Sequence, residues 1–216
     1  MSQPSLRITE IFFSLQGESN LVGLPTVFIR LTGCPLRCVY CDTAYAFEGG
    51  ERWEFDTILD KVESYNTKYI CVTGGEPLAQ PNCIKLLEAL CDKGYVVSLE
   101  TSGALSVERV DERVLKVLDL KTPSSEESHR NLWSNIQYLN ATDQIKFVVG
   151  SNADFDWLEA KCLEHRLTER VSDVLVSPVH ETFSIERLAE RVLQSTHSLR
   201  LQMQLHKLIW NDARGK

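Results

Sequence analysis

The sequence alternates short strand-like runs with amphipathic helical stretches along most of its length. The strand-like runs are Val27–Leu31, Tyr69–Thr73, Val96–Glu100, Val117–Leu120, Ile145–Val149, Val174–Ser177 and Leu199–Leu205. Apolar helical faces lie between some of them, formed by Ile84, Leu87, Leu90 and Cys91 in one stretch and by Leu158, Cys162 and Leu163 in another. Because parallel strands need crossover helices, this pattern predicts an α/β fold with a mostly parallel sheet. A full eight-unit barrel usually takes about 250 residues, so this chain of 216 predicts an incomplete, open TIM-like βα barrel of about six or seven strands.

The chain shows no low-complexity segment, internal repeat or long Pro/Gly/Ser-rich linker, which predicts a single domain over residues 1–216. It has no apolar run near the roughly 20 residues that cross a bilayer and no secretory signal, so we expect a cytoplasmic protein without a membrane partner. A formal net charge of −7 argues against a nucleic-acid partner, because such binding relies on clustered Lys and Arg. A small-molecule substrate is the better expectation.

Cys34, Cys38 and Cys41 form a Cys-x3-Cys-x2-Cys loop, the most informative motif in the chain. This spacing lets three thiolates hold one iron–sulfur cluster and leaves one iron without a cysteine ligand from the loop. A zinc site is the metal-binding alternative, although no second Cys pair or His pair completes it. The remaining cysteines are expected to be core residues: Cys71, Cys83, Cys91 and Cys162.

Polar and Gly-containing segments follow the predicted strands at their carboxyl ends, where barrel enzymes build their sites. They are Thr32–Cys34, Thr73–Pro77, Thr101–Gly103, Asp119–Lys121, Ser177–Pro178 and His206–Lys207. Three of them also have an ordinary explanation, since Gly-Gly is common in turns, Thr-Ser-Gly caps helices and a lone Lys is usually solvated.

The cysteine loop, with Tyr40 before its last cysteine, resembles the radical S-adenosylmethionine (SAM) superfamily. The resemblance implies a [4Fe-4S] cluster on Cys34, Cys38 and Cys41, whose open iron binds SAM to generate a radical. It also implies a set of SAM-contacting residues: Tyr40, Cys41, Asp42, Gly74, Gly75, Glu76, Gly103, Asp119, Leu120, Lys121, Ser177, Pro178, Val179 and His180.

The segments Leu15-Gln16-Gly17-Glu18, Cys41-Asp42-Thr43 and Gln204-Leu205-His206-Lys207 are similar to the 7-carboxy-7-deazaguanine synthase family of queuosine biosynthesis. The resemblance implies ring contraction of 6-carboxy-5,6,7,8-tetrahydropterin with loss of ammonia, beginning with hydrogen abstraction at C6. It implies a homodimer and an electron donor such as flavodoxin or ferredoxin. It assigns substrate contacts to Leu15, Gln16, Gly17, Glu18, Arg30, Thr101 and His206, and Mg2+ binding to Thr43.

Strand alternation adds its own prediction for two of these residues. Arg30 lies opposite the aliphatic face of Val27–Leu31 and would point inward, where its guanidinium could pair with a carboxylate; the alternative is a surface Arg on an edge strand. In Leu199–Leu205 the same alternation would continue beyond the run and place Gln202, Gln204 and His206 on one face, toward the interior or toward solvent. Thr43 could equally cap a turn after Asp42.

Two rival functions remain, a glycyl-radical-enzyme activating enzyme and a non-catalytic iron–sulfur protein. Leu-Gln-Gly-Glu and Cys-Asp-Thr argue against the first, and the polar segments on successive strand ends argue against the second. The polar stretch 124–131 is expected to form a long loop or a flexible lid. The ten residues after His206 have no predicted role.

Overall fold

Seven parallel strands form most of one curved sheet in the computed structural model, which describes residues 4–211 and 213–216. Their bounds are β2 Pro25–Leu31, β4 Tyr69–Gly74, β5 Val96–Thr101, β6 Leu115–Asp119, β7 Gln144–Val149, β8 Asp173–Pro178 and β9 Leu199–Leu201. All seven predicted strands are therefore present. The two end strands of the sheet, β3 and β9, do not pair with each other, so the barrel is open as predicted.

Two antiparallel strands, β1 (Ser5–Leu15) and β3 (Glu51–Glu54), extend the sheet beyond β2 and were not predicted. The full order is β3-β1-β2-β4-β5-β6-β7-β8-β9. β1 lacks a simple alternating pattern because its pairing with β2 shifts register between Ile8 and Glu10. Before the shift Leu6 and Ile8 are buried in the core, and after it Phe12 borders the interior cavity. A bulge of this kind turns a strand over and hides its period from the sequence.

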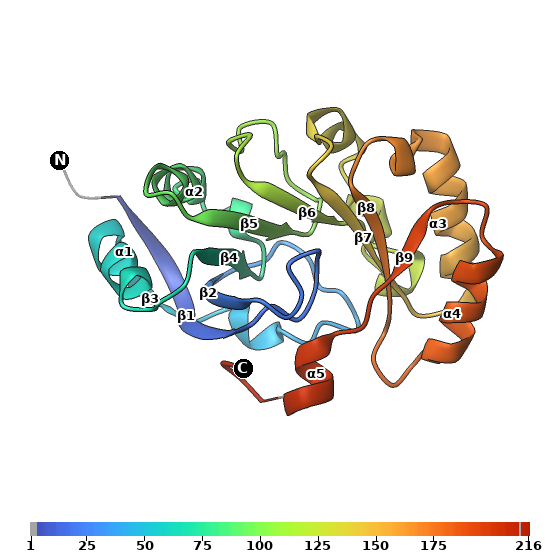
Figure 1. The fold of residues 1–216 in the computed structure, drawn as a ribbon, viewed down its shortest axis with the longest axis horizontal. Coiled ribbons are helices and arrows are strands. Elements are labelled where there is room, and N and C mark those ends of the chain that lie inside the picture. Colours follow the sequence, from blue (N-terminus) through green and yellow to red (C-terminus); the bar gives the residue numbers. More distant parts are fainter. Residues whose placement is uncertain (1–3, 212) are drawn as a thin grey trace.

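Four helices lie along the outer side of the sheet, and a fifth lies on its inner side (Figure 1). The outer helices are α1 Phe55–Glu63, α2 Cys83–Asp92, α3 Asn152–His165 and α4 Ile185–Gln194, and the inner one is α5 Leu205–Trp210. Short 3-10 turns occur at η1 Ala44–Ala46, η2 Pro77–Ala79, η3 Pro123–Ser125, η4 Ser128–Arg130, η5 Trp133–Tyr138 and η6 Leu167–Glu169. None of the helices in the described residues has both the length and the apolar composition needed to traverse a bilayer.

The hydrophobic core fills the space between the sheet and the outer helices. Val27, Ile29 and Leu31 on β2 are fully buried there, as are Leu87 and Leu90 on α2. Removing such side chains from water supplies about 25 cal/mol per Å2 of apolar area, the main driving force for this arrangement. The core thus fixes one face of each strand and leaves the other face, which points inward, for polar residues.

The structure corrects three sequence expectations. The last strand ends at Leu201, and Leu205–Trp210 form a helix, so the alternation expected over Leu199–Leu205 and on to His206 is wrong beyond Leu201. Leu163 is 73% exposed, because it lies about 100° around α3 from the buried Cys162. The stretch 124–131 belongs to a long loop, as expected, but it is not a free lid: it contains η3 and η4 and packs against the cysteine loop, where Ser125 O accepts a hydrogen bond from Val39 N (3.3 Å).

Candidate active site

A cavity of about 680 Å3 opens at the carboxyl ends of the parallel strands. Most of the residues that the sequence assigned to the site line it: Leu15, Gln16, Gly17, Glu18, Arg30, Cys34, Cys38, Tyr40, Cys41, Asp42, Thr43, Gly74, Gly75, Thr101, Asp119, Lys121, Pro178, Val179, His180 and His206. Residues separated by up to 191 positions in the chain therefore meet in one place. Four assigned residues are buried without lining the cavity: Glu76, Gly103, Leu120 and Ser177.

The cysteine loop is anchored at both sides so that its three thiols face this cavity. Gly33 N donates to Ala46 O (2.8 Å), and Leu36, buried to 1% exposure, pins the middle of the loop. Burial raises the pKa of all three thiols, and that of Cys38 to about 11, while the nearby Lys121 ammonium acts in the opposite direction. The free thiols are therefore protonated at neutral pH, and binding of a metal cluster would release their protons.

Among the described residues no three His, Cys, Asp or Glu side chains are close enough to hold a single metal ion. The three thiols are thus gathered on one cavity wall without closing around one ion. A four-iron cluster can be held by three cysteines with one iron left open, whereas structural zinc takes four closed ligands, so three thiols without a fourth ligand beside them in the described residues fit a cluster better than zinc.

The segment after β4 packs directly against the cysteine loop. A Cβ on Gly75 would lie 2.3 Å from Gly33 O and 2.8 Å from the Cys34 Cβ, so only glycine permits this approach. Glu76 is fully buried and accepts hydrogen bonds from Thr101 Oγ1 (2.9 Å) and Ser102 N (2.7 Å). Its carboxylate therefore ties the β4 segment to the end of β5 and braces the cavity wall from behind.

A network of charged side chains forms the cavity floor. Lys121 contacts Asp119 (Nζ–Oδ2, 2.9 Å), and Lys146 pairs with Glu18 and lies 4.0 Å from the same Asp119 oxygen. Although burial lowers the pKa of Lys146, the surrounding carboxylates Glu18, Asp119 and Glu100 outweigh it and raise the pKa overall, so the ammonium stays charged. Burial and the Glu18 charge raise the pKa of Glu100 to about 7.

Arg30 points from β2 into the cavity, as strand alternation predicted. β2 lies between β1 and β4, so the alternative of an edge-strand Arg on the surface is wrong. Its Nε donates to Glu10 Oε1 (2.7 Å), and no hydrogen bond joins its two Nη atoms to any described residue. The two Nη groups of the guanidinium are thus available to bind an anionic group.

The segment Gln16–Glu18 holds helix α5 against the cavity. Gly17 O accepts from Leu205 N (3.0 Å), and Glu18 Oε1 accepts from Gln204 Nε2 (2.7 Å). A Cβ on Gly17 would lie 2.2 Å from His206 Nδ1, so the imidazole needs a glycine here. His206 consequently reaches the cavity from a helix, although the sequence predicted a strand, and burial lowers its pKa so that the ring is neutral at pH 7.

Gln202 does not face the cavity, whereas Gln204 and His206 do. It is buried away from the cavity, where its Oε1 accepts from Ser19 N and its Nε2 donates to Ser19 O, both at 3.0 Å. The prediction that Gln202 shares a strand face with His206 is therefore wrong, because the strand ends before it.

Thr43 lies at the cavity wall beside Asp42. Its hydroxyl donates to Asp42 Oδ1 (2.8 Å), the turn contact that the sequence offered as the alternative to metal binding. Burial disfavours ionisation of Asp42, but Lys207, 3.2 Å away, and the Thr43 hydroxyl together lower its pKa to about 2. The ionised Asp42 carboxylate, although paired with Lys207, and the Thr43 hydroxyl offer oxygens of the kind that Mg2+ takes as ligands.

Several buried polar atoms near the cavity have no hydrogen-bond partner among the described residues. They are Gln16 Nε2, Tyr40 Oη, Asp119 Oδ1 and Ser177 Oγ. Buried polar groups are normally paired, so unpaired ones mark places where a bound molecule supplies the partner. All four belong to residues that the sequence assigned to the cofactor or the substrate, so this set of donors and acceptors fits a bound SAM and a polar heterocycle.

Glu100 and Lys146 are cavity-lining residues that the sequence reasoning missed. A signal existed for Lys146, which is a lone cation inside the otherwise apolar run Ile145–Val149. Glu100 stands at the last position of its predicted run, where its direction is ambiguous. Cys71, expected in the core, is fully buried but also borders the cavity.

Comparison with known proteins agrees with this geometry. The Radical SAM superfamily model matches residues 28–128, which contain the cysteine loop and the strand ends through Lys121. The fold and site thus define a radical SAM enzyme, with the [4Fe-4S] cluster and SAM as its cofactors.

Relatives narrow the class. A 7-carboxy-7-deazaguanine synthase from Chlorobaculum tepidum is 43% identical and covers 99% of both chains, and one from Koribacter versatilis is 37% identical over 95% of this chain and 97% of its own. The crystal structure of QueE from Escherichia coli has a TM-score of 0.78 and 25% identity, covering 94% of this chain and 95% of that one. The chain belongs to the 7-carboxy-7-deazaguanine synthase family.

Proposed function

We propose that this chain converts 6-carboxy-5,6,7,8-tetrahydropterin to 7-carboxy-7-deazaguanine with loss of ammonia, a carbon–nitrogen lyase step of queuosine biosynthesis. The observation that carries the proposal is that the three cysteine thiols and the Arg30 guanidinium line one cavity. A site for a metal cluster and a site for a carboxylate therefore share one enclosed space, as a reaction between SAM and a carboxylated ring requires.

Cys34, Cys38 and Cys41 would hold the cluster, and Gly74, Gly75, Asp119 and Lys121 would contact SAM beside it. Together the cluster and SAM supply a hydrogen-abstracting radical when bound. The protein brings the β4 segment against the cysteine loop and offers the unpaired Asp119 Oδ1 as a hydrogen-bond acceptor. By the family resemblance, further residues would contact this cofactor: Tyr40, Asp42, Glu76, Gly103, Leu120 and Ser177–His180.

The substrate would lie across the cavity from the cysteine loop. Arg30 would bind its carboxylate, while Leu15–Glu18, Thr101 and His206 would bind the ring. A neutral His206 can donate or accept one hydrogen bond, and Gln16 Nε2 has no partner in the described residues, so both can contact the polar edges of a pterin. His206 and Lys207 of helix α5 line this side of the cavity.

Thr43 and Asp42 would contribute to a Mg2+ site that the substrate completes, because one hydroxyl and one carboxylate leave most of the six positions open. An external donor such as flavodoxin or ferredoxin would reduce the cluster, and Val39, 62% exposed within the cysteine loop, brings that loop to the surface. We expect one radical SAM domain over residues 1–216, acting as a homodimer. We place it in the cytoplasm, where thiols stay reduced.

The decisive experiment is turnover under anaerobic conditions. The reconstituted protein would be mixed with reductant, Mg2+, SAM and 6-carboxytetrahydropterin, and mass spectrometry would search for 7-carboxy-7-deazaguanine. We expect the product with the natural sequence and none with Cys38→Ala. Formation of 5′-deoxyadenosine without ring-contracted product would keep the superfamily and reject this substrate, as a glycyl-radical activating enzyme would require.

A further inference from the structure

The Arg30 guanidinium is held by residues that neither the sequence motifs nor the family assignment point to. Glu10 Oε1 accepts two hydrogen bonds, one from Arg30 Nε (2.7 Å) and one from the Tyr45 hydroxyl (2.8 Å). The ion pair is mostly buried, with side-chain exposures of 16% for Arg30 and 22% for Glu10. Charge-assisted bonds in such a setting fix geometry more firmly than exposed ones.

A backbone irregularity aims Glu10 at Arg30. In β1 the register with β2 shifts between Ile8, opposite Leu31, and Glu10, opposite Arg30. Ile8 is 2% exposed in the core, so an unbroken two-residue period would turn Glu10 toward the core as well. The bulge at Thr9 turns the strand over and places Glu10 on the same strand face as Phe12, beside the Arg30 side chain. Bulges beside active sites commonly re-aim a side chain in this way.

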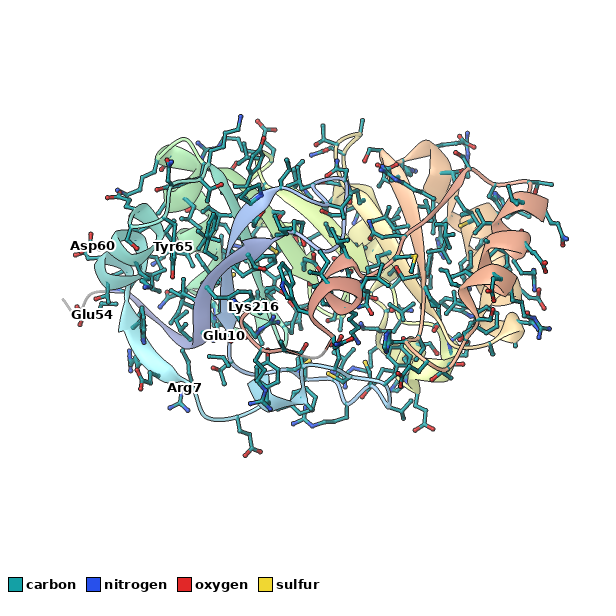
Figure 2. All side chains as sticks on the ribbon, turned by 60° about the horizontal axis from the view of Figure 1, so that its bottom comes forward. Arg7, Glu10, Glu54, Asp60, Tyr65 and Lys216 are labelled. Carbon is teal, nitrogen blue, oxygen red and sulfur yellow. The ribbon has the colours of Figure 1, made fainter. Side chains whose placement is uncertain are left out.

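The rings of Phe12 and Tyr45, together with Glu10, form a frame around the Arg30 guanidinium. The Arg30 Cζ lies 5.8 Å from the ring centres of both Phe12 and Tyr45, and Phe12 stacks on Phe28. Arg214, near the C-terminus, covers the Tyr45 ring at 4.3 Å. In the view of Figure 2 the labels of Glu10 and the C-terminal Lys216 lie next to each other.

We propose that Glu10 and Tyr45 are positioning residues that occupy the Nε side of Arg30 and so direct its two Nη groups toward the substrate carboxylate. This inference rests on the proposed function, which gives Arg30 that carboxylate. Bidentate pairing needs a planar fork in a fixed orientation, and the frame supplies it before the ligand arrives. The frame is thus a specificity device that favours carboxylated pterins over those without the carboxylate.

Ligand binding to the reconstituted protein with SAM, but without reductant, tests this proposal by anaerobic calorimetry. The two ligands are 6-carboxytetrahydropterin and tetrahydropterin, which lacks the carboxylate. We expect Glu10→Ala to weaken binding of the carboxylated ligand by up to about 100-fold, because a misdirected Arg30 loses its charge-assisted hydrogen bonds to the carboxylate, and to change binding of the other about twofold or less. Tyr45→Phe should cost roughly two- to tenfold for the carboxylated ligand.

Two further variants separate positioning from simple stabilisation. Glu10→Gln keeps an oxygen that can accept both hydrogen bonds, so it should recover most of the binding that Glu10→Ala loses. Adding Glu10→Ala to Arg30→Ala should cause no further loss, since the frame acts only through Arg30. The control is Glu51→Ala, an exposed glutamate on the neighbouring strand β3, which should leave both affinities unchanged.

Equal losses for both ligands, or losses that add fully in the double variant, would overturn the proposal. If Arg30→Ala weakens binding and Glu10→Ala does not, this inference alone fails. If Arg30→Ala itself leaves binding of the carboxylated ligand unchanged, the assignment of Arg30 in the proposed function fails first, and the positioning role fails with it.

Discussion

Strands β6 and β7 carry buried charges at both ends, and the two ends differ in how completely those charges are paired. At the amino end, Lys116 and Asp143 are 2% and 0% exposed and pair at 3.0 Å. Asp143 also accepts from Lys116 N (2.9 Å) and Asn140 N (2.8 Å), so both of its oxygens are bonded. This pair is complete within the protein.

At the carboxyl end the pairing is incomplete. Asp119 Oδ2 contacts Lys121, but Asp119 Oδ1 is buried without a partner among the described residues, and no hydrogen bond from them reaches the Glu100 carboxylate. Unpaired buried groups cost roughly 1–3 kcal/mol each, so a fold gains nothing from them unless something else binds there. The comparison separates a structural end of the sheet from a functional end.

The largest effect is expected for a substitution at the functional, carboxyl end of the sheet. Cys38→Ala should abolish product formation and lower bound iron, because the cluster loses a ligand. The free energy of unfolding of the cluster-free protein should change by about 1 kcal/mol or less, since Cys38 is only partly buried. Iron content, product mass spectrometry and a thermal melt measure these three quantities. Full activity in this variant would remove the cluster from the cysteine loop.

The next largest effect is expected for a substitution at the structural, amino end of the sheet. Asp143→Ala leaves the Lys116 ammonium buried and alone, which should cost about 3–5 kcal/mol and lower the Tm by on the order of 10 °C. Turnover per folded molecule below that Tm should stay near that of the natural sequence. Replacing both partners, as Lys116→Met with Asp143→Leu, should restore most of the stability. A large loss of turnover at unchanged Tm would contradict the separation of the two ends.

A smaller effect concerns the pH dependence of stability. The pKa of Glu100 is raised from 4.5 to about 7, so the folded protein holds this proton more tightly than the unfolded chain does. Its contribution to stability is fully present below pH 4.5 and is lost as the pH rises through 7. Glu100→Gln should therefore raise the Tm by a few degrees at pH 8, at roughly 2–4 °C per kcal/mol, and hardly change it at pH 4. Thermal melts across this range would show an equal shift at every pH if Glu100 titrated normally.

The smallest effect is expected for a solvent-exposed ion pair. Arg166 and Glu169 form an ion pair with side-chain exposures of 71% and 58%. Glu169→Ala should change the free energy of unfolding by about 0.5 kcal/mol or less. Urea unfolding of this variant gives the reference change in the free energy of unfolding, with which the changes in Asp143→Ala and Glu100→Gln are compared. A cost near that of Asp143→Ala would mean that burial does not set the difference between pairs.

The sequence predicted most of the sheet because each parallel strand is a short apolar run that the core requires. It could not reveal β1, whose period is reset by the bulge at Thr9, nor helix α5, whose place depends on contacts with Gly17 and Glu18 far away in the chain. The motif residues at strand ends were predictable because topology gathers such ends. Glu10 and Lys146 belong to no motif and Glu100 only begins the Glu100–Gly103 segment, so only their three-dimensional neighbours show what these side chains face.

The most direct test of this account is a crystal structure of the anaerobically reconstituted protein with SAM and 6-carboxytetrahydropterin. We predict a cluster on Cys34, Cys38 and Cys41, SAM beside Asp119, and the substrate carboxylate within hydrogen-bond distance of both Arg30 Nη atoms. A substrate bound outside the cavity, or one whose carboxylate lies away from Arg30, would contradict the account.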